Sequence, residues 1–178
     1  MPNHEYLDIV DENNQPTGQK RLRSQVHTFG DWHQTAHVYL FRKIDNQIQF
    51  LVHLRAKHKD HSPNKWDTRF GGHLKSGESY DDAALSEIKE EVGLDLKLSD
   101  FILGPIVKKS EHNNNEFGKI YFFNFLGDEK NLNFSDNEVS EIKWLFAKEI
   151  IEKLKSEPEI WAPDLADFKL VFDYLNKF

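Results

Sequence analysis

The stretch that decides the fold is GHLKSGESYDDAALSEIKEEVGL, residues 72–94. Its middle predicts a helix over Tyr80–Val92, because Ser79 or Ser76 can cap the start and Gly93 follows the end. Apolar residues recur along one side of this helix at Ala84, Leu85, Ile88 and Val92. Such a stripe is typical of a helix that packs on a β-sheet.

The same helix carries three glutamates at i, i+3 and i+4, which places Glu87, Glu90 and Glu91 on one face. Like charges at this spacing destabilise a helix by about 0.2–0.5 kcal/mol per pair, and Lys89 lies on another face. A divalent cation would turn this repulsion into attraction, and carboxylates are ligands that Mg²⁺ and Mn²⁺ prefer. The cluster indicates either a metal site for phosphate chemistry or a solvated acidic face.

Residues 72–94 closely resemble the Nudix box, the signature of the Nudix hydrolase family. The signature is Gly, five residues, Glu, seven residues, then Arg-Glu-apolar-x-Glu-Glu-x-Gly-apolar. The chain matches it at Gly72, Glu78, Glu87, Ile88, Glu90, Glu91, Gly93 and Leu94. The one departure is Ser86, which stands where the family has arginine.

The resemblance implies an α/β (α+β) fold in which a mixed β-sheet lies between helices and the box forms a loop, a helix and a loop. It also implies that Glu87, Glu90 and Glu91 bind Mg²⁺ or Mn²⁺, and that one of them or a later Glu deprotonates water. Water then attacks phosphorus and splits a nucleoside diphosphate that is linked to another group. Metals suit this reaction because they neutralise the diphosphate and lower the pKa of bound water. Glu78 is expected to support the loop.

The departure at Ser86 opens an alternative function. In the family the arginine holds a box glutamate in place, so Ser86 removes a positive partner. Arg69, three residues before the box, is a candidate to replace it. The alternative to a hydrolase is a catalytically weakened Nudix domain that binds a nucleotide or a protein partner. The three retained glutamates favour the hydrolase.

The flanks of the box resemble isopentenyl diphosphate isomerases and the Nudix hydrolases most similar to them. The shared features are residues 7–12, residues 16–18, His27, Trp32-His33, Arg55-x-x-x-Lys59 and Gly72-His73. In the isomerases, histidines matching His73 and His33 bind a metal, with one near His27 as a third ligand. Basic residues matching Arg55 and Lys59 bind the diphosphate. A hydrogen-bonded loop histidine is the alternative for His33 and His73.

The chain contains no cysteine. This excludes disulfides, thiolate metal sites and cysteine nucleophiles. The isomerase needs a cysteine where this chain has Gly71, so isomerase activity is the least favoured of the three functions. Hydrolysis needs only carboxylates, metal and water.

Strand and turn signals surround the box on both sides. Strands are expected at 5–10, 19–23, 36–44, 49–55, 101–108, 119–126 and 141–146, and helices at 148–155 and 165–175. Neither a repeat nor a linker divides the chain, and 178 residues suit one core. A single domain over residues 1–178 is therefore expected.

The charge of the chain is unevenly distributed. The net charge of −7 comes from 23 Lys and Arg against 30 Asp and Glu, and it argues against nucleic acid and membrane surfaces as partners. Residues 55–69 are locally basic, so Arg55 and Lys59 are expected to bind the diphosphate of a small-molecule substrate. The N-terminus lacks a signal-peptide pattern, and a cytoplasmic location is expected. The resemblance allows a homodimer.

Several other side chains have open interpretations. Relatives place an additional metal or base carboxylate in the loop at 108–117, where Glu116 is preferred over Glu111. His33 and His37 would lie about 13 Å apart on a strand, so both cannot reach one ion. Histidines expected at the surface or in packing are His53, His58, His61 and His112. Candidate pocket walls, with core packing as the alternative, are Phe29, Trp32, Trp66 and Trp161.

Overall fold

The computed structural model describes residues 5–58, 62–134 and 137–178. Its strands are β1 (Tyr6–Val10), β2 (Pro16–Leu22), β3 (Trp32–Ile44), β4 (Gln47–Arg55), β5 (Trp66–Asp67), β6 (Phe70–His73), β7 (Phe101–Glu111), β8 (Asn114–Asn124) and β9 (Val139–Phe146). Its α-helices are α1 (Arg23–Phe29), α2 (Tyr80–Val92), α3 (Ala147–Ser156) and α4 (Leu165–Leu175). Within the described residues, no helix is both long and apolar enough to span a membrane.

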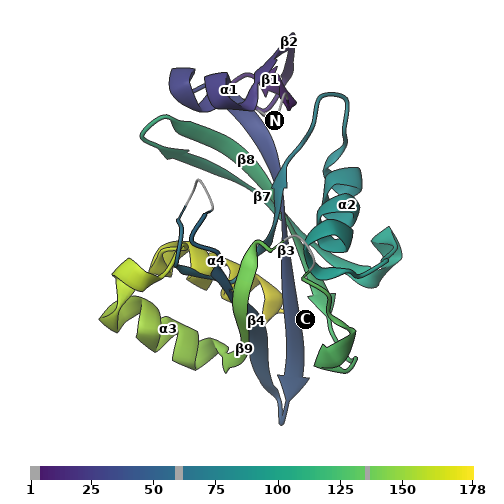
Figure 1. Ribbon diagram of the computed structural model, residues 1–178, viewed down its shortest axis with the longest axis vertical. Coiled ribbons are helices and arrows are strands. Elements are labelled where there is room, and N and C mark those ends of the chain that lie inside the picture. Colours follow the sequence, from purple (N-terminus) through teal and green to yellow (C-terminus); the bar gives the residue numbers. More distant parts are fainter. Residues whose placement is uncertain (1–4, 59–61, 135–136) are drawn as a thin grey trace.

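Strand β3 forms the centre of a mixed sheet (Figure 1). β8 runs parallel along one edge of β3, whereas β6 and β4 pair antiparallel with its other edge. β6 ends its pairing at Val38 and β4 begins at Phe41, so these two strands diverge along β3. The link between β5 and β6, which contains Arg69, crosses this point of divergence. β1 and β2 form a separate hairpin.

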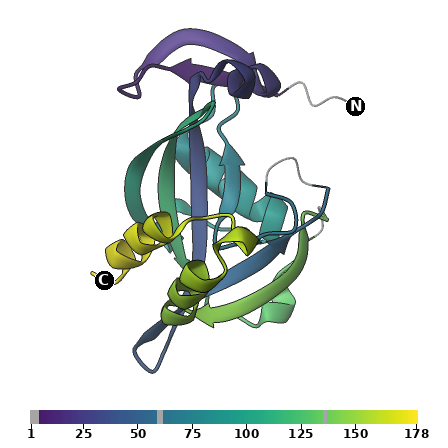
Figure 2. The same ribbon diagram turned by 90° about the vertical axis from the view of Figure 1, so that its left-hand side faces the viewer.

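Helices cover both faces of the sheet, as the resemblance implied. α2 lies on one face, and α3 and α4 lie on the other (Figures 1 and 2). Each face has its own buried cluster: Val38, Leu40 and Leu51 face α2, while Tyr39, Phe50 and Phe122 face α3 and α4. Because side chains alternate along β3, this one strand contributes residues to both cores.

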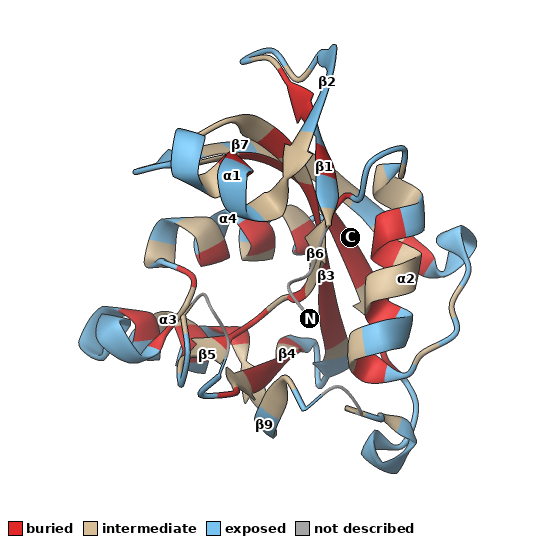
Figure 3. Ribbon diagram, turned by 45° about the horizontal axis from the view of Figure 1, so that its top comes forward, coloured by how far each residue is buried: buried red, intermediate tan, exposed pale blue. Residues whose placement is uncertain are grey.

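The termini of α2 are set by the signals in its sequence. The Ser79 side chain accepts a hydrogen bond from the Asp82 backbone N–H at 3.2 Å, and Gly93 ends the helix in the left-handed conformation with φ of 75°. Buried side chains on α2 face the sheet (Figure 3): Ala83, Ala84, Ile88 and Val92. The expected helix over Tyr80–Val92 is confirmed, and its cap is Ser79 rather than Ser76.

Three parts of the fold differ from the sequence prediction. α1 occupies residues 23–29, where no helix was expected, because Val26 is its one buried residue and gives no apolar stripe. The short strands β5 and β6 form in a stretch that resembles a loop. The expected loop at 108–117 is instead the paired end of the β7–β8 hairpin, with Lys108 opposite Phe117.

Candidate active site

The three box glutamates line one open cleft of about 810 Å³ beside β6. Glu87, Glu90 and Glu91 project from α2, and Gly71 and Gly72 of β6 form the facing wall. The three carboxylates thus lie on a common surface, as their helical spacing predicts.

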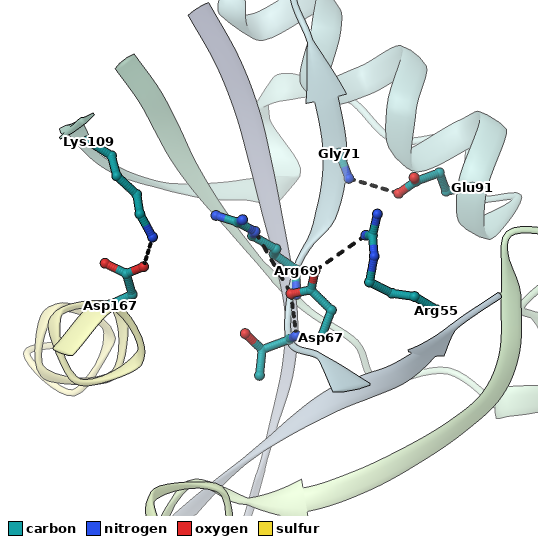
Figure 4. A network of polar contacts seen from close by, with 8 residues as sticks. Arg55, Asp67, Arg69, Gly71, Glu91, Lys109 and Asp167 are labelled. Carbon is teal, nitrogen blue, oxygen red and sulfur yellow. Dashed lines mark hydrogen bonds and ion pairs between the residues drawn. The ribbon is translucent and has the colours of Figure 1, made fainter. Parts of the chain in front are cut away.

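The glycines of β6 let the glutamates approach the sheet closely. The backbone N–H of Gly71 donates a hydrogen bond to Glu91 Oε2 at 2.8 Å (Figure 4). A Cβ on residue 72 would lie 2.7 Å from Glu87 Oε1, so a larger residue than Gly72 would displace that carboxylate. Glu90 is more exposed, and its Oε1 lies 3.9 Å from Lys75 Nζ.

The electrostatics of the cleft favour a cation. Burial, and to a smaller extent the neighbouring charge of Glu90, raises the pKa of Glu87 to about 7. A divalent ion would remove this repulsion, and an all-carboxylate set suits Mg²⁺ or Mn²⁺. The residues present therefore fit the metal that the box implies.

Hydrogen bonds of Ser86 and Glu78 stabilise the loop that precedes α2. Glu78 Oε2 accepts a hydrogen bond from the Lys75 backbone N–H at 2.9 Å, and Glu78 Oε1 accepts one from Ser86 Oγ at 3.1 Å. Glu78 therefore supports the loop, as expected. Arg69 does not replace the missing box arginine, because the ion pair that it forms within the described residues is with Asp67, at 3.8 Å.

Three histidines converge on the other side of β6. His27 of α1, His33 of β3 and His73 of β6 each offer a ring nitrogen, and these atoms all lie within 4.8 Å of one another. Thr35 pairs directly with His73 across the β3–β6 ladder, which puts His33 and His73 on the same face. The Nε2 atoms of His27 and His73 are 3.1 Å apart.

The ring of His33 is buried, and one of its two nitrogens has no hydrogen-bond partner among the described residues. Its Nδ1 lies 3.0 Å from the Asp31 carbonyl oxygen, which can only accept, so Nδ1 carries the proton and Nε2 has the lone pair. Nε2 is buried and has no hydrogen-bond partner among the described residues. Burial lowers the pKa of His33 and keeps the ring neutral. These histidines fit a metal that prefers nitrogen ligands.

A second cleft, of about 460 Å³, lies beside the histidines. Its basic walls include Arg23, Arg55 and Arg69, and it shares Arg23, Gly71 and His73 with the glutamate cleft. Figure 4 shows the Arg55 guanidinium directed toward the end of α2 that carries Glu91. Arg55 thus lies where a diphosphate could bridge both clefts, whereas Lys59 lies outside the described residues.

Asp67 organises the arginines of this cleft. It is 2% exposed, and its carboxylate accepts a hydrogen bond from Arg55 Nη1 at 3.4 Å. Burial alone would raise the pKa of Asp67, but Arg69, His53 and Arg55 together lower it. The carboxylate of Asp67 therefore lies within ion-pair distance of both Arg55 and Arg69.

Glu116 lies in the second cleft but outside the histidine group. It is buried on β8 directly opposite His33 in the parallel β3–β8 ladder, and it accepts a hydrogen bond from Asn114 Nδ2 at 3.3 Å. Burial would raise the pKa of Glu116, but His37, Arg69 and His33 together lower it. Glu111 is exposed and lies 3.3 Å from Lys109 Nζ.

The remaining sequence candidates lie elsewhere. His53 is buried against Phe70, His58 is exposed at the second cleft, His112 is exposed beside the β7–β8 turn, and His61 lies outside the described residues. Among the aromatic candidates, Trp161 is buried beside Trp66, Trp32 packs on Phe117, and Phe29 is 65% exposed rather than packed in a core. As far as the described residues show, these four rings line neither cleft.

Sequence reasoning missed Arg23, Asp67 and Glu138, all of which line the second cleft. Arg23 begins a helix that the sequence did not predict, and Asp67 lies in a two-residue strand. These three residues reach the cleft only through tertiary contacts. The one signal in the sequence that could have indicated this cleft was the basic run of residues 55–69.

Comparisons with known proteins show what this chain is similar to. The model of the NUDIX domain family matches residues 31–165. An uncharacterised Nudix hydrolase of Clostridium acetobutylicum is 37% identical over 123 residues, which cover 67% of this chain and 59% of that protein. Nudix hydrolase 3 of Arabidopsis thaliana is 28% identical over 167 residues, which cover 89% of this chain and 21% of that protein. The chain thus spans less than two thirds of both relatives.

Two further likenesses cover almost the whole chain. An isopentenyl-diphosphate Delta-isomerase of Aliivibrio fischeri is 28% identical over 180 residues, which cover 97% of this chain and 98% of that protein. A crystal structure from Deinococcus radiodurans has a TM-score of 0.74 at 22% identity and covers 96% of this chain and 99% of that one. The latter shows a shared fold.

Proposed function

This chain belongs to the Nudix family, and we propose that it is a Mg²⁺- or Mn²⁺-dependent hydrolase. In this proposal it cleaves the diphosphate bond of a nucleoside diphosphate derivative or a related small organic diphosphate by water attack on phosphorus. The observation that carries the proposal is that two clefts adjoin each other at β6. One is lined by Glu87, Glu90 and Glu91, and the other is lined by Arg23 and Arg55.

The protein groups have separate roles in this reaction. When bound, the metal ions neutralise the diphosphate and lower the pKa of the attacking water. The box glutamates hold them, and Gly71 fixes Glu91 through a backbone hydrogen bond. Arg55, held by Asp67, donates to phosphate oxygens. A glutamate of the box accepts the proton of the water.

We also propose that His27, His33 and His73 bind a second kind of metal ion. The support is the buried lone pair of His33 Nε2 and the mutual distance of at most 4.8 Å between the ring nitrogens. Glu116, buried opposite His33, is proposed as a further ligand. A homodimer and a cytoplasmic location stay predictions.

Isomerase activity is disfavoured by the backbone at Gly71. This residue has φ of +128°, and a Cβ built on it would lie 2.0 Å from the carbonyl oxygen of Ala36. A cysteine therefore does not fit at this position without movement of β3 or β6. The full sequence also contains no cysteine that could act from elsewhere.

The weakened binding domain is the second candidate, because Ser86 replaces the box arginine. The contacts of this region favour the hydrolase. Ser86 holds Glu78, and the backbone of Gly71 holds Glu91. These hydrogen bonds give the box an internal support that does not require an arginine.

The test is phosphate release from nucleotide sugars, dinucleoside polyphosphates, nucleoside di- and triphosphates and isoprenoid diphosphates, with Mg²⁺ or Mn²⁺. We expect turnover of at least one class, and a loss of about 100-fold or more in kcat for Glu90→Gln and Glu91→Gln. Glu152→Gln is the matched control, since Glu152 is an exposed helical glutamate outside both clefts. Nucleotide binding without turnover of any diphosphate would support the binding domain instead.

A further inference from the structure

A small recess extends from the second cleft under α4. Its volume is about 30 Å³, roughly the space of two water-sized spheres. His37, Arg69 and Glu116 line both the cleft and the recess, while Lys109 of β7 and Asp167 of α4 close its far side. A substrate whose diphosphate lies in the cleft can therefore extend one terminal group into the recess.

Arg69 brings unused hydrogen-bond donors to this recess. Its Nε lies 3.8 Å from Asp67 Oδ1, which is longer than a hydrogen bond, and its guanidinium donates no hydrogen bond within the described residues. Figure 4 shows this side chain directed toward the pair formed by Lys109 and Asp167. A guanidinium has five N–H donors, and a half-buried one requires acceptors.

The opposite wall supplies acceptors. Asp167 Oδ2 accepts a hydrogen bond from Lys109 Nζ at 2.5 Å, and its other carboxylate oxygen retains accepting capacity. Arg69 and Lys109 balance the charges of Asp167 and Glu116, and burial lowers the pKa of His37 to about 4, so that ring is neutral. A second anion therefore gains little in this recess. A hydroxyl group suits it, because a hydroxyl accepts from Arg69 and donates to Asp167.

The other walls exclude two competing kinds of group. An isoprenoid tail would place apolar groups against two charged side chains and leave the unused N–H donors of Arg69 without acceptors, which is unfavourable. A nucleobase lacks a stacking surface, because the ring of Tyr39 is only 4% exposed and packs between Phe50 and Phe122. The apolar side chains in the recess are aliphatic: Val107, Ile120, Leu170 and Val171. Such walls accommodate the C–H groups of a terminal hydroxymethyl group.

We propose that the substrate is a sugar or polyol diphosphate, and that Arg69 and Asp167 select it by binding a terminal hydroxyl in this recess. The inference rests on the proposed function, because the diphosphate is the part that holds the substrate in the cleft. Arg69 is then a specificity-determining residue rather than a replacement for the box arginine.

The experiment compares four diphosphates that differ in one substituent: ribose 5-diphosphate, ADP, isopentenyl diphosphate and methyl diphosphate. We expect the wild type to have its highest kcat/KM with ribose 5-diphosphate. Arg69→Gln is expected to lower the ratio of kcat/KM for ribose 5-diphosphate to that for methyl diphosphate by about 10- to 100-fold. Arg69→Lys keeps the positive charge but lacks the planar set of N–H donors of a guanidinium, so it should recover only part of this ratio.

Arg42→Gln is the matched control, because Arg42 and Arg69 have exposed side-chain fractions of 29% and 28%, and Arg42 lies outside both clefts. It should leave the ratio unchanged. Equal losses on both substrates in Arg69→Gln, or preference for isopentenyl diphosphate or ADP, would overturn the proposal. If no diphosphate is hydrolysed, calorimetric titration with the same four compounds compares their binding, so failure of the hydrolase proposal is distinguished from failure of this one.

Discussion

Glu87→Gln is expected to stabilise the metal-free protein at about pH 8. Burial and Glu90 raise the pKa of Glu87 from 4.5 to about 7. A carboxyl whose pKa is higher in the folded state loses stability as pH rises from its unfolded to its folded pKa. At about 1.4 kcal/mol per pKa unit, the charged Glu87 costs about 3 kcal/mol at pH 8. Glutamine removes this cost.

The assay is thermal unfolding of both proteins in EDTA. For a chain of this size, about 3 kcal/mol corresponds to an increase in Tm of roughly 6–12 °C in Glu87→Gln at pH 8. The difference should disappear at about pH 4, below the unfolded pKa. Added Mg²⁺ should stabilise the wild type more than the variant. An equal or lower Tm for metal-free Glu87→Gln at pH 8 would refute the electrostatic reasoning.

Four other predictions test separate parts of the structure. Gly71→Ala should cost about 3 kcal/mol or more of unfolding free energy in urea, whereas Gly77→Ala, which has a positive φ but open space, should cost only about 1–2 kcal/mol. The pKa of His37 falls from 6.5 to about 4 on folding. The free energy of unfolding should therefore decrease as the pH falls from 6.5 to 4, by about 2 kcal/mol at pH 5. His37→Gln should reduce this decrease, as measured by urea unfolding. Arg55→Gln should raise the KM for a diphosphate about tenfold or more in steady-state kinetics. His33→Gln should reduce bound Co²⁺, measured by elemental analysis after dialysis, by one ion per chain.

The fold was predictable where local signals and burial agree. The helix of residues 80–92 has a cap, an apolar stripe and a terminal glycine, and the structure keeps all three. The C-terminal helix α4 has the expected bounds of Leu165–Leu175. By contrast, β6 is the sequence FGGH, whose glycines disfavour strands, and it is extended because it pairs with β3. The polar ends of β7 and β8 likewise acquire strand structure from each other.

The sequence predicted those parts of the site whose residues lie close together along the chain. Helical spacing alone placed Glu87, Glu90 and Glu91 together. His33 and His73 came from the resemblance, since three separate elements bring the histidines together. Asp67 was missed although a basic run surrounds it, because its role depends on arginines that approach it only in the folded sheet.

The most direct test of the central claim is the anomalous scattering of Mn²⁺ in crystals that contain methylene diphosphonate, a diphosphate analogue that resists hydrolysis. We predict a manganese peak coordinated by oxygens of Glu87, Glu90 or Glu91 and by the diphosphonate, at about 2.0–2.3 Å. A diphosphonate bound without manganese at these glutamates, or manganese confined to the three histidines, would contradict the account.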